Sequence, residues 1–467
     1  MKLPIITTMC TAFLILAVQV NVNAQTQKAA TFSLSLKQAQ EHAIKYNVDS
    51  KNTTLDMEIA KKQIWEITAA GLPQINAQAN YQHLFKVPEM SLGGSTYLAT
   101  NLPTGTNLTS DDITNENVYM GFTPAPPIKL GVKNNTTLDI TVSQLIFSGE
   151  YIVGLQASKV FYQFAEQKKM KTELEIKEAV ANVYALAMLI GNNLDVMQKS
   201  LDNSKKTLSD MKQMLNQGMI ENTDVDQIEF VTLTLQNGVS NLNRDLEIQM
   251  LNLKYVLGIP FSDKVILTDR LESIAESIKL ESLLSIPFNI NNNLDYQMML
   301  NGEQISILNL KREKSTYLPN LAAVYRHSEK MNKPEFDFAP TDVFQVSMNI
   351  PIFSSGLRKV RVQQKQLELQ KTVNLKENLN NGLQLNYVNA LNKLTQAYET
   401  YQNDQKNIEL TKRIYDKTQI KFSEGIATSR EITDNLNQYL SAQRSLYTSI
   451  FALFTAKNTL DKLNNNL

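Results

Sequence analysis

The amino-acid sequence predicts a mainly α-helical fold with a small β part, assembled from two copies of one plan. Three observations support this prediction. Short motifs recur in the same order in both halves of the chain, four segments alternate apolar and polar residues at the period of a β-strand, and two long segments carry heptad repeats. Each half is therefore expected to contain two strands and one long helical hairpin.

Residues 1–24 have the composition of a signal peptide. Lys2 is followed by an apolar run over residues 3–20, and Val22-Asn23-Ala24 forms a small-residue cleavage pattern before Gln25. A membrane anchor is the alternative, but threonines interrupt the run, which is short for a span of about 20 residues. We expect the mature protein to begin at Gln25 and to leave the cytoplasm.

The composition argues against catalysis and nucleic-acid binding. The single cysteine, Cys10, lies in the leader, so no disulfide, zinc thiolate or cysteine nucleophile is expected in the mature chain. His42, His83 and His327 have no second ligand three or four residues away, so no metal pair is predicted. The formal net charge of +0 gives no reason to expect nucleic acid as a partner. We therefore predict no catalytic, cofactor-binding or metal site.

After the leader, we find no apolar run of about 18 residues, the length that a membrane-spanning helix needs. The best candidate, residues 183–190, is short and lies within a longer heptad pattern. A membrane-integral form would then have to be a closed β-barrel, because only helices and closed barrels satisfy every backbone polar group in lipid.

Three landmarks recur in the same order in the two halves. They pair Leu72-Pro73 with Leu318-Pro319, Phe147-Ser148 with Phe353-Ser354, and Gly218 with Gly425. The last interval is conserved in length, at 71 residues in the first copy and 72 in the second, whereas the interval before it shrinks from 74 residues to 34. A rigid helix resists changes in length and a surface loop accepts them. We therefore place a long helix in the constant interval and a long external loop over residues 83–136.

Four segments alternate apolar and polar residues, as β-strands do when one of their faces contacts water. Their apolar positions are Ile75, Ala77, Ala79 and Tyr81; Leu138, Ile140 and Val142; Leu321, Ala323 and Tyr325; and Phe344, Val346, Met348 and Ile350. A soluble antiparallel sheet with one wet face shows the same alternation. A barrel wall is favoured because we find only four such strands and because the polar face of the first is uncharged Gln and Asn. Bacterial barrels need about eight strands or more, so several chains would have to share one.

Two helices of about 65 residues, or about 100 Å at about 1.5 Å per residue, are predicted over residues 155–217 and 357–424. Heptad positions such as Val180, Val183, Ala187 and Ile190 in the first, and Tyr387, Leu391 and Leu394 in the second, indicate a coiled-coil seam. Each helix stops at a glycine loop, 218–222 or 425–429, and a return helix follows. Thr223, Asp224 and Ser429 are expected to cap the return helices, and Glu431 stands in the first turn of the second.

The duplicated motifs resemble the TolC family of outer-membrane efflux proteins over residues 33–463. The resemblance rests on the two Leu-Pro pairs, on Phe147-Ser148-Gly149 and the matching run over residues 351–356, and on the two glycine tips with the acids that follow them. It implies a homotrimer with a shared twelve-stranded transmembrane β-barrel and a periplasmic α-barrel. It divides the chain into the signal peptide 1–24, a first repeat 25–260, an equatorial linker 261–288 and a second repeat 289–467.

The resemblance also implies a function. The chain would be the outer-membrane exit duct of a tripartite efflux or type I secretion system in a Gram-negative bacterium, extending into the periplasm. Its partners would be a periplasmic adaptor, an inner-membrane transporter and outer-membrane lipid. The hairpin tips at Gly218 and Gly425 would contact the adaptor. A non-channel periplasmic coiled-coil scaffold or adaptor is the alternative, but it would need a lipoyl-like or barrel domain between the helices, and we find no such segment.

A periplasmic gate is expected at the tips. Phe422 and Ala427 stand where relatives commonly have a tyrosine and an arginine that hold the tip closed, so the closing contacts should differ in this chain. Asp224 is present at the matching position, with Arg430 as a candidate partner. Glu431 and Asp434 stand three residues apart on one helix face, and without the resemblance an ordinary acidic first turn is the preferred interpretation of both. The resemblance further implies that they ring the constricted mouth.

Overall fold

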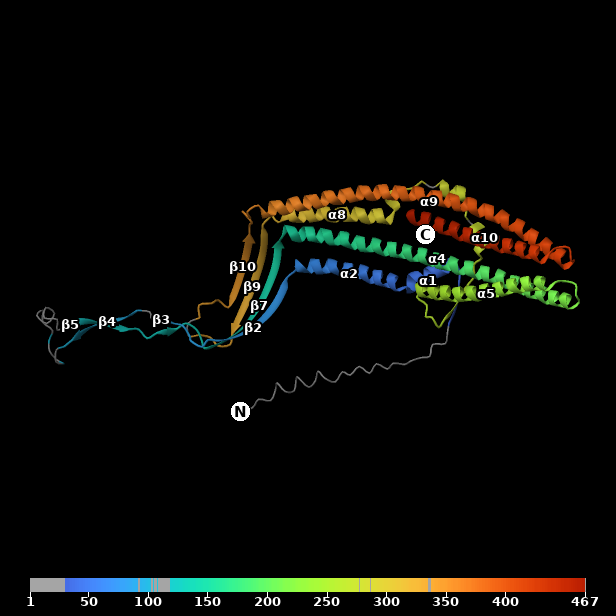
Figure 1. The fold of residues 1–467 in the computed structure, drawn as a ribbon. Coiled ribbons are helices and arrows are strands. Elements are labelled where there is room, and N and C mark those ends of the chain that lie inside the picture. Colours follow the sequence, from blue (N-terminus) through green and yellow to red (C-terminus); the bar gives the residue numbers. More distant parts are fainter. Residues whose placement is uncertain are drawn as a thin grey trace, which may run out of the picture. The chain divides into compact units, whose positions relative to one another are not determined.

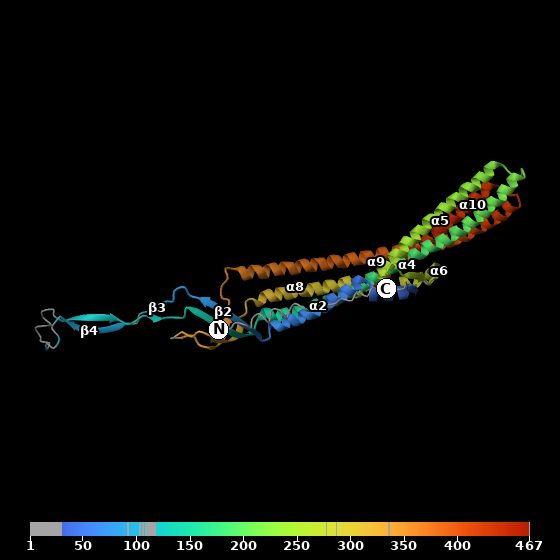
Figure 2. The same cartoon turned by 90° about the horizontal axis from the view of Figure 1, so that it is seen from below.

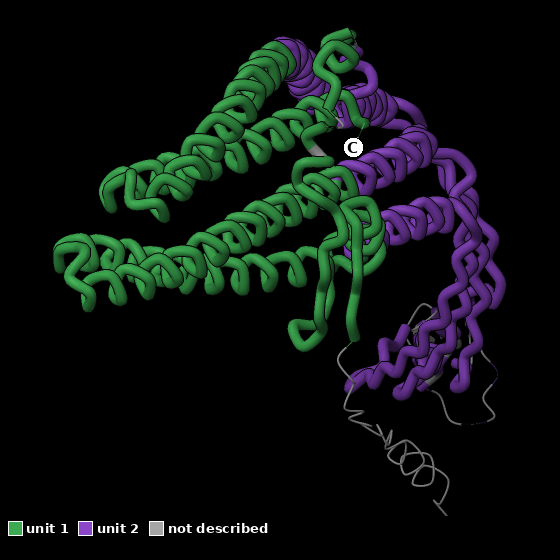
Figure 3. The backbone as a smooth tube through the Cα atoms, turned by 90° about the vertical axis from the view of Figure 1, so that its right-hand side faces the viewer, with its two compact units in different colours: residues 1–51, 172–288, 386–467 green, residues 52–171, 289–385 purple. Residues whose placement is uncertain are grey.

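A computed structural model describes residues 30–90, 93–101, 104, 107, 118–276, 278–285, 287–334 and 337–466. The predicted signal peptide, residues 1–24, lies outside the described residues. The chain forms two compact units (Figure 3), residues 1–51, 172–288 and 386–467 in the first and residues 52–171 and 289–385 in the second. Each unit draws on both predicted repeats, because the two longest helices pass from one unit into the other. The units therefore do not follow the order of the repeats along the chain.

The second unit contains a four-stranded antiparallel sheet (Figure 1). Its strands, in spatial order, are β10 (Asp342–Asn349), β9 (Asn320–Lys330), β7 (Asn134–Phe147) and β2 (Gln74–His83). These are the four strands that the alternation predicted. Strands β7 and β9 pair in the middle of the sheet, so the two repeats meet there, and a register shift between Leu145 and Phe147 marks the helix end of β7.

The four predicted strands form the sheet, but residues 83–136, which we expected to form a loop, contain strands as well. This segment contains β3 (Glu89–Met90), β4 (Gly94–Thr100), β5 (Val118–Pro124) and β6 (Ile128–Lys129), which pair as β3 with β6 and β4 with β5. The pairs form a two-stranded ribbon between β2 and β7. The segment as a whole is rich in Asn, Thr, Gly and Pro, and its strands have at most seven residues, so its composition favoured a loop.

Four helices of the second unit run from or into the sheet. They are α2 (Val48–Ala70), α8 (Leu294–Ser315), and the first parts of α4 (Gly149–Asn216) and α9 (Leu357–Ser423). Ion pairs join them: Lys171 Nζ lies 2.5 Å from Asp295 Oδ1, and Lys376 Nζ lies 2.7 Å from Glu303 Oε2. The turn before α9 requires positive φ at Ser355 (50°) and Gly356 (81°), which explains the glycine there.

The first unit holds the rest of α4 and α9 with α1 (Leu36–Tyr46), α5 (Asn222–Leu257) and α10 (Ser429–Leu463). A parallel pair of strands, β1 (Thr31–Leu34) and β8 (Lys264–Leu267), was not expected from the sequence. Two short helices follow, α6 (Leu271–Glu276) and α7 (Leu280–Leu284), and the 3-10 turn η1 (Ile290–Asn292) leads into α8. Thus the predicted linker 261–288 carries a strand and two helices.

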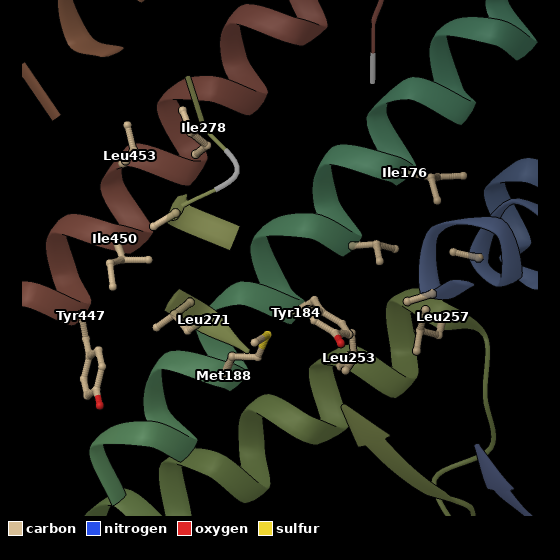
Figure 4. Close-up of a cluster of buried hydrophobic side chains, with 14 of the residues drawn as sticks. Ile176, Tyr184, Met188, Leu253, Leu257, Leu271, Ile278, Tyr447, Ile450 and Leu453 are labelled. Atoms are coloured by element: carbon tan, nitrogen blue, oxygen red, sulfur yellow. The ribbon is translucent and has the colours of Figure 1, made fainter. Parts of the chain in front are cut away.

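The main core of the first unit lies where α4, α5 and α10 pack with this small strand pair. Figure 4 shows side chains from these elements converging, including Tyr184 and Met188 from α4, Leu253 from α5 and Leu453 from α10. Val180, which the heptad pattern placed on the seam, is fully buried. The seam therefore provides the core of the bundle, as heptad spacing requires.

One described helix, α4, is long enough and contains an 18-residue window apolar enough to cross a membrane by length and composition, contrary to the expectation from the sequence. Packing accounts for part of this composition, because Ile176, Val180, Tyr184 and Met188 of α4 belong to the core and 33% of the apolar window is buried. Core helices of soluble proteins and membrane spans cannot be separated by composition alone.

Candidate functional site

The sheet of the second unit presents two chemically different faces. Residues paired across neighbouring strands share a face, and successive residues along a strand alternate between faces. One row across the sheet joins Ile75, Val142, Tyr325 and Phe344, and the adjacent row, on the opposite face, joins Gln74, Ser143, Val324 and Gln345. The alternation read from the sequence is thus in phase in all four strands.

The side chains of the apolar face are largely exposed in the single chain. Ile75 is 71% exposed, Phe344 is 71% exposed and Met348 is 60% exposed. Monomeric soluble proteins rarely expose contiguous apolar patches of this kind. Within the described part of the chain, no helix covers this face, and so its side chains need an apolar environment from outside the chain.

The polar face carries amides, hydroxyls and few charges. Along β2 it consists of Gln74, Asn76, Gln78, Asn80 and Gln82, and β7 adds Asp139, Thr141 and Ser143. Gln78 donates to Asn80 over 3.1 Å, and Asn80 donates to Asp139 over 3.4 Å. The side chains of β2 are exposed and those of β7 are half-buried, and they bond to one another along and across the strands, which suits a surface in contact with water.

Each strand pair ends at its loop side in the same cluster of side chains. In the first pair, His83 Nδ1 lies 2.6 Å from Asn134 Oδ1, and the Tyr81 hydroxyl donates to the same oxygen over 3.3 Å. In the second, His327 Nδ1 lies 2.8 Å from Asp342 Oδ1, to which the Tyr325 hydroxyl donates over 2.7 Å.

This Tyr-x-His arrangement is part of the internal duplication, and it gives two of the three histidines a role in joining strands. The repeated Tyr-x-His motif is visible in the sequence, because both copies follow a Leu-Pro pair. The partner residues lie far away in the chain, so the clusters could not be assembled from spacing alone.

The tips of the two helical hairpins, in the first unit, have matching turns. Gly218 (φ 73°) and Gly425 (φ 74°) adopt the left-handed conformation that ends a helix. The next residue donates back to the last helical turn in each case, Met219 N–H to Met214 O over 3.0 Å and Ile426 N–H to Lys421 O over 2.8 Å. Met219 and Ile426 are each 69% exposed, so each tip presents one apolar side chain to its surroundings.

A contact between the two hairpins lies beside these tips. The Ser429 hydroxyl at the start of α10 donates to Asp224 Oδ1 near the start of α5. Figure 2 shows these two helices side by side. Arg430, the candidate partner of Asp224, instead lies with its Nε 3.8 Å from Asp434 Oδ2, and both side chains are largely exposed. Within the chain, therefore, the partner of Asp224 is a serine one residue before the predicted arginine.

The capping of the return helices differs from expectation. Thr428, not Ser429, is the N-cap of α10, and its hydroxyl accepts from Glu431 N–H over 3.2 Å. The Glu431 carboxylate accepts in return from Thr428 N–H over 3.0 Å, which completes a capping box. The N-cap of α5 is Glu221, without a side-chain cap bond, rather than Thr223 or Asp224. Asp224 is thus available for the contact with Ser429.

Behind the tips lies a second apolar cluster of the first unit. Phe422 packs against it, and Tyr415 stacks on Tyr439 with ring centroids 5.7 Å apart. Burial raises the pKa of both tyrosines, so both hydroxyls remain neutral well into the alkaline range. Asn435 donates to Thr418 over 2.9 Å, and the buried Ser204 and Thr232 hydroxyls bond over 2.7 Å. The cluster behind the tips thus combines apolar packing with hydrogen bonds between neutral side chains.

The described residues contain no group of three or more His, Cys, Asp and Glu side chains placed to hold a metal ion. The remaining histidine, His42, packs edge-on against Phe32 and lies 4.5 Å from the ring of Tyr46. Burial, assisted by Lys45, lowers the pKa of His42. Its surroundings are those of a packing residue.

Comparison with solved structures identifies the fold. Neither a protein-family model nor a curated protein matches the sequence. The chain is similar to CusC (TM-score 0.69, 15% identity, covering 94% of this chain and 95% of CusC), in a study of transmembrane channel formation. It is similar to the Campylobacter jejuni CmeC outer membrane channel (TM-score 0.68, 15% identity, covering 92% and 86%). It is also similar to the open state of the Neisseria gonorrhoeae MtrE outer membrane channel (TM-score 0.68, 14% identity, covering 92% and 88%).

These likenesses extend over almost the whole chain, and they confirm the predicted fold class: long helices in a duplicated plan with a small antiparallel sheet. At such identities the likeness concerns the fold, and individual residues have to be argued from this chain.

Proposed function

We propose that this protein is an outer-membrane channel, the exit duct of a tripartite efflux or type I secretion system. The observation that carries the proposal is the four-stranded sheet, apolar on one exposed face and polar on the other, with β2 and β10 as its edge strands. A sheet that separates lipid from water needs this sorting of its faces, and in lipid it needs closed edges.

Closure requires further copies of the chain. Three copies would supply twelve strands, enough for a barrel with a water-filled interior. The strands alternate in direction from β2 to β10, so β10 of one copy would meet β2 of the next in antiparallel orientation. The homotrimer is further supported by the full-length likeness to outer-membrane channels.

We place the sheet in the outer membrane of a Gram-negative bacterium and the helical hairpins in the periplasm. The partners would be an inner-membrane transporter and a periplasmic adaptor. The exposed Met219 and Ile426, held out by the turns at Gly218 and Gly425, offer the adaptor two equivalent apolar contacts per protomer.

We further propose that the tips form the gate. Asp224, bonded to Ser429, would hold the two hairpins together, and Phe422 would support this contact by packing from behind. Glu431 and Asp434 are both exposed, and the residues between them, Ile432 and Thr433, are buried. The two carboxylates therefore stand on the exposed face of α10, where Asp434 lies next to Arg430. Threefold symmetry would place six such carboxylates around the mouth of the channel.

Two measurements test the channel. Outer-membrane fractions should contain a heat-sensitive trimer in detergent, and the purified trimer should conduct ions in planar bilayers. A monomer that high salt extracts from the membrane fraction, without conductance, would instead support the periplasmic scaffold or adaptor.

The gate is tested by charge removal. We expect Glu431→Gln combined with Asp434→Asn to lower cation preference and block by multivalent cations, because a ring of carboxylates attracts cations. Glutamine at position 431 keeps the capping box, so helix α10 should start normally. Selectivity unchanged from the wild type would mean that the two acids serve only the start of the helix.

A further inference from the structure

A small crevice of about 20 Å³ lies between the two hairpins of the first unit, behind the tips. Four of its lining residues carry hydroxyl groups: Ser204 and Thr207 of α4, Tyr415 of α9 and Thr433 of α10. The other lining side chains are aliphatic and come from α5 and α10. A space needs a volume of about 10–15 Å³ to hold one water molecule. The crevice therefore fits a single water and no larger ligand.

Three of these hydroxyls can only accept a further hydrogen bond. Thr207 and Thr433 each donate to the carbonyl oxygen four residues earlier, over 3.1 Å and 2.8 Å. Thr232 does the same over 2.8 Å, so the serine must be the donor in the 2.7 Å bond between Ser204 and Thr232. Because a hydroxyl group has one proton and two lone pairs, Ser204, Thr207 and Thr433 have only lone pairs left for a ligand.

The fourth hydroxyl, that of Tyr415, has a proton to donate. Tyr415 is 8% exposed, and its hydroxyl has no hydrogen-bond partner among the described residues. The described side-chain atoms that are both unpartnered and closed to water do not include this oxygen, so water can reach it. A buried donor without an acceptor is unfavourable, and a water molecule supplies the acceptor.

We propose that the crevice binds one ordered water molecule, which accepts from Tyr415 and donates to Ser204 and Thr433. Buried waters typically make about three hydrogen bonds to polar groups that lack other partners, as this one would. Ser204 belongs to the first hairpin, whereas Tyr415 and Thr433 belong to the second. The water therefore joins the two hairpins.

This bridge adds to the contact between Asp224 and Ser429. Thr433 donates to Ser429 O, and the Ser429 hydroxyl donates to Asp224 Oδ1. The two connections between the hairpins thus lie about one turn apart along α10. The role of the water in closing the tips rests on the proposed gate, whereas the binding of the water does not.

Crystals of the intact protein test the site directly. We expect a water peak within about 2.5–3.2 Å of Tyr415 Oη, Ser204 Oγ and Thr433 Oγ1. Tyr415→Phe keeps the ring and removes the donor, so the peak should lose most of its occupancy. Tyr439→Phe is the matched control, because Tyr439 stacks on Tyr415 but does not line the crevice. A wild type without the peak, a peak that contacts only one hairpin, or equal occupancy in Tyr415→Phe would overturn the proposal.

Single-channel recordings of trimers in planar bilayers measure the role in closing. We expect Tyr415→Phe to raise the ratio of open to closed time about fivefold, the effect of one lost bond, and Tyr439→Phe to leave it unchanged. A ratio in Tyr415→Phe equal to that of the wild type would show that the water does not help to hold the tips closed. A wild type without conductance would instead refute the channel, and the crystals would still decide whether the water is bound.

Discussion

At the residue scale, Tyr184 shows how one side chain joins elements that lie far apart in the sequence. It is fully buried, and its hydroxyl donates to Leu34 O at 3.0 Å and lies 3.1 Å from Asp269 Oδ2. The same carboxylate oxygen accepts from Leu36 N–H over 2.7 Å at the start of α1. Tyr184 therefore ties α4 to β1 and to the segment that directly follows β8. Burial raises its pKa to about 12.

This pKa predicts a loss of stability in alkali. The native pKa lies above the unfolded value of 10.0, so the contribution of Tyr184 is complete below pH 10 and is lost as the pH rises towards 12. We expect Tyr184→Phe to lower the unfolding free energy at pH 8 by about 1–3 kcal/mol, because Leu34 O loses its donor.

Guanidinium titrations in detergent at pH 8, 10 and 11 measure both effects. The variant should lose less stability than the wild type between pH 10 and 11. It should not become insensitive to pH, because burial also raises the pKa of Tyr401, Tyr415, Tyr439 and Tyr447. Parallel pH profiles for the two proteins would contradict the assignment of the shift to Tyr184.

Sequence reasoning reached the residues of the candidate site unevenly. Heptad spacing predicted buried Val180 and Ala187, because the period of a helix seam is visible in any window of the chain. It did not predict the bond between Asp224 and Ser429 or the capping role of Thr428. These depend on the angle at which two hairpins meet and on a shift of one residue at a helix start, and neither leaves a periodic signal.

At the element scale, the end of α5 depends on a glycine. Gly258 has φ 70°, and its N–H closes the last turn by donating to Lys254 O and Tyr255 O. A Cβ atom there would stand 2.7 Å from Tyr46 O, a backbone atom that cannot rotate away. We expect Gly258→Ala to destabilise the protein by about 1–3 kcal/mol through left-handed strain and this clash.

Gly302→Ala is the matched control for this prediction. Gly302 lies inside α8, and an added Cβ would meet nothing within 4 Å. The substitution should be neutral or stabilising by up to about 1 kcal/mol. Heat-dissociation temperatures of the two variants in detergent compare them directly, and equal temperatures would show that the backbone contact at Gly258 does not matter.

The faces of β2 yield a second prediction for an element. Ala77 and Ala79 share the apolar face, and Asn76 and Gln78 share the polar face. In a barrel, arginine at 77 or 79 would place a charge in lipid at a cost of about 2–4 kcal/mol near the bilayer midplane. Arginine at 76 or 78 would face water and should be tolerated. Equal trimer yields from all four variants would mean that the two faces of β2 are not sorted between lipid and water. The proposal of a channel would then lose the observation that carries it.

The main strands and helices were predictable from the sequence, and the connections were less so. Period-two alternation is strong in β2 and β10, and the heptad pattern repeats over many turns of α4 and α9. The ribbon of β3 to β6 escaped prediction because its strands have at most seven residues and lie in a segment rich in Asn, Gly and Pro, whose composition resembles that of a loop. Strand β8 escaped because parallel pairing with β1 joins segments more than 200 residues apart, which local patterns do not reveal.

At the scale of the whole molecule, the proposal depends on how copies of the chain meet. The sheet has β2 at one edge and β10 at the other. An open edge presents unpaired N–H and C=O groups, which in lipid must find partners on another chain. Pairing of β10 with β2 of the next copy satisfies both edges at once, and repetition by a threefold axis closes the ring.

Disulfide cross-linking tests this closure, because the single cysteine of the sequence, Cys10, lies in the predicted leader. With Gln78→Cys fixed in β2, single cysteines are placed in turn over residues 343–348 of β10. Residue 78 lies on the polar face, which β10 presents at its odd-numbered positions. Side chains on opposite faces of a sheet cannot approach within the Cβ separation of about 3.5–4.5 Å that a disulfide needs.

We therefore expect oxidation to give covalent dimers and trimers with at least one odd-numbered partner and with no even-numbered one. Two strands lie between β2 and β10 within a chain, so a bond between them has to join different copies. Cross-linking at even-numbered positions would mean that the copies do not continue one sheet. Monomers at every position would mean that β2 and β10 do not meet, and the twelve-stranded barrel would have to be abandoned.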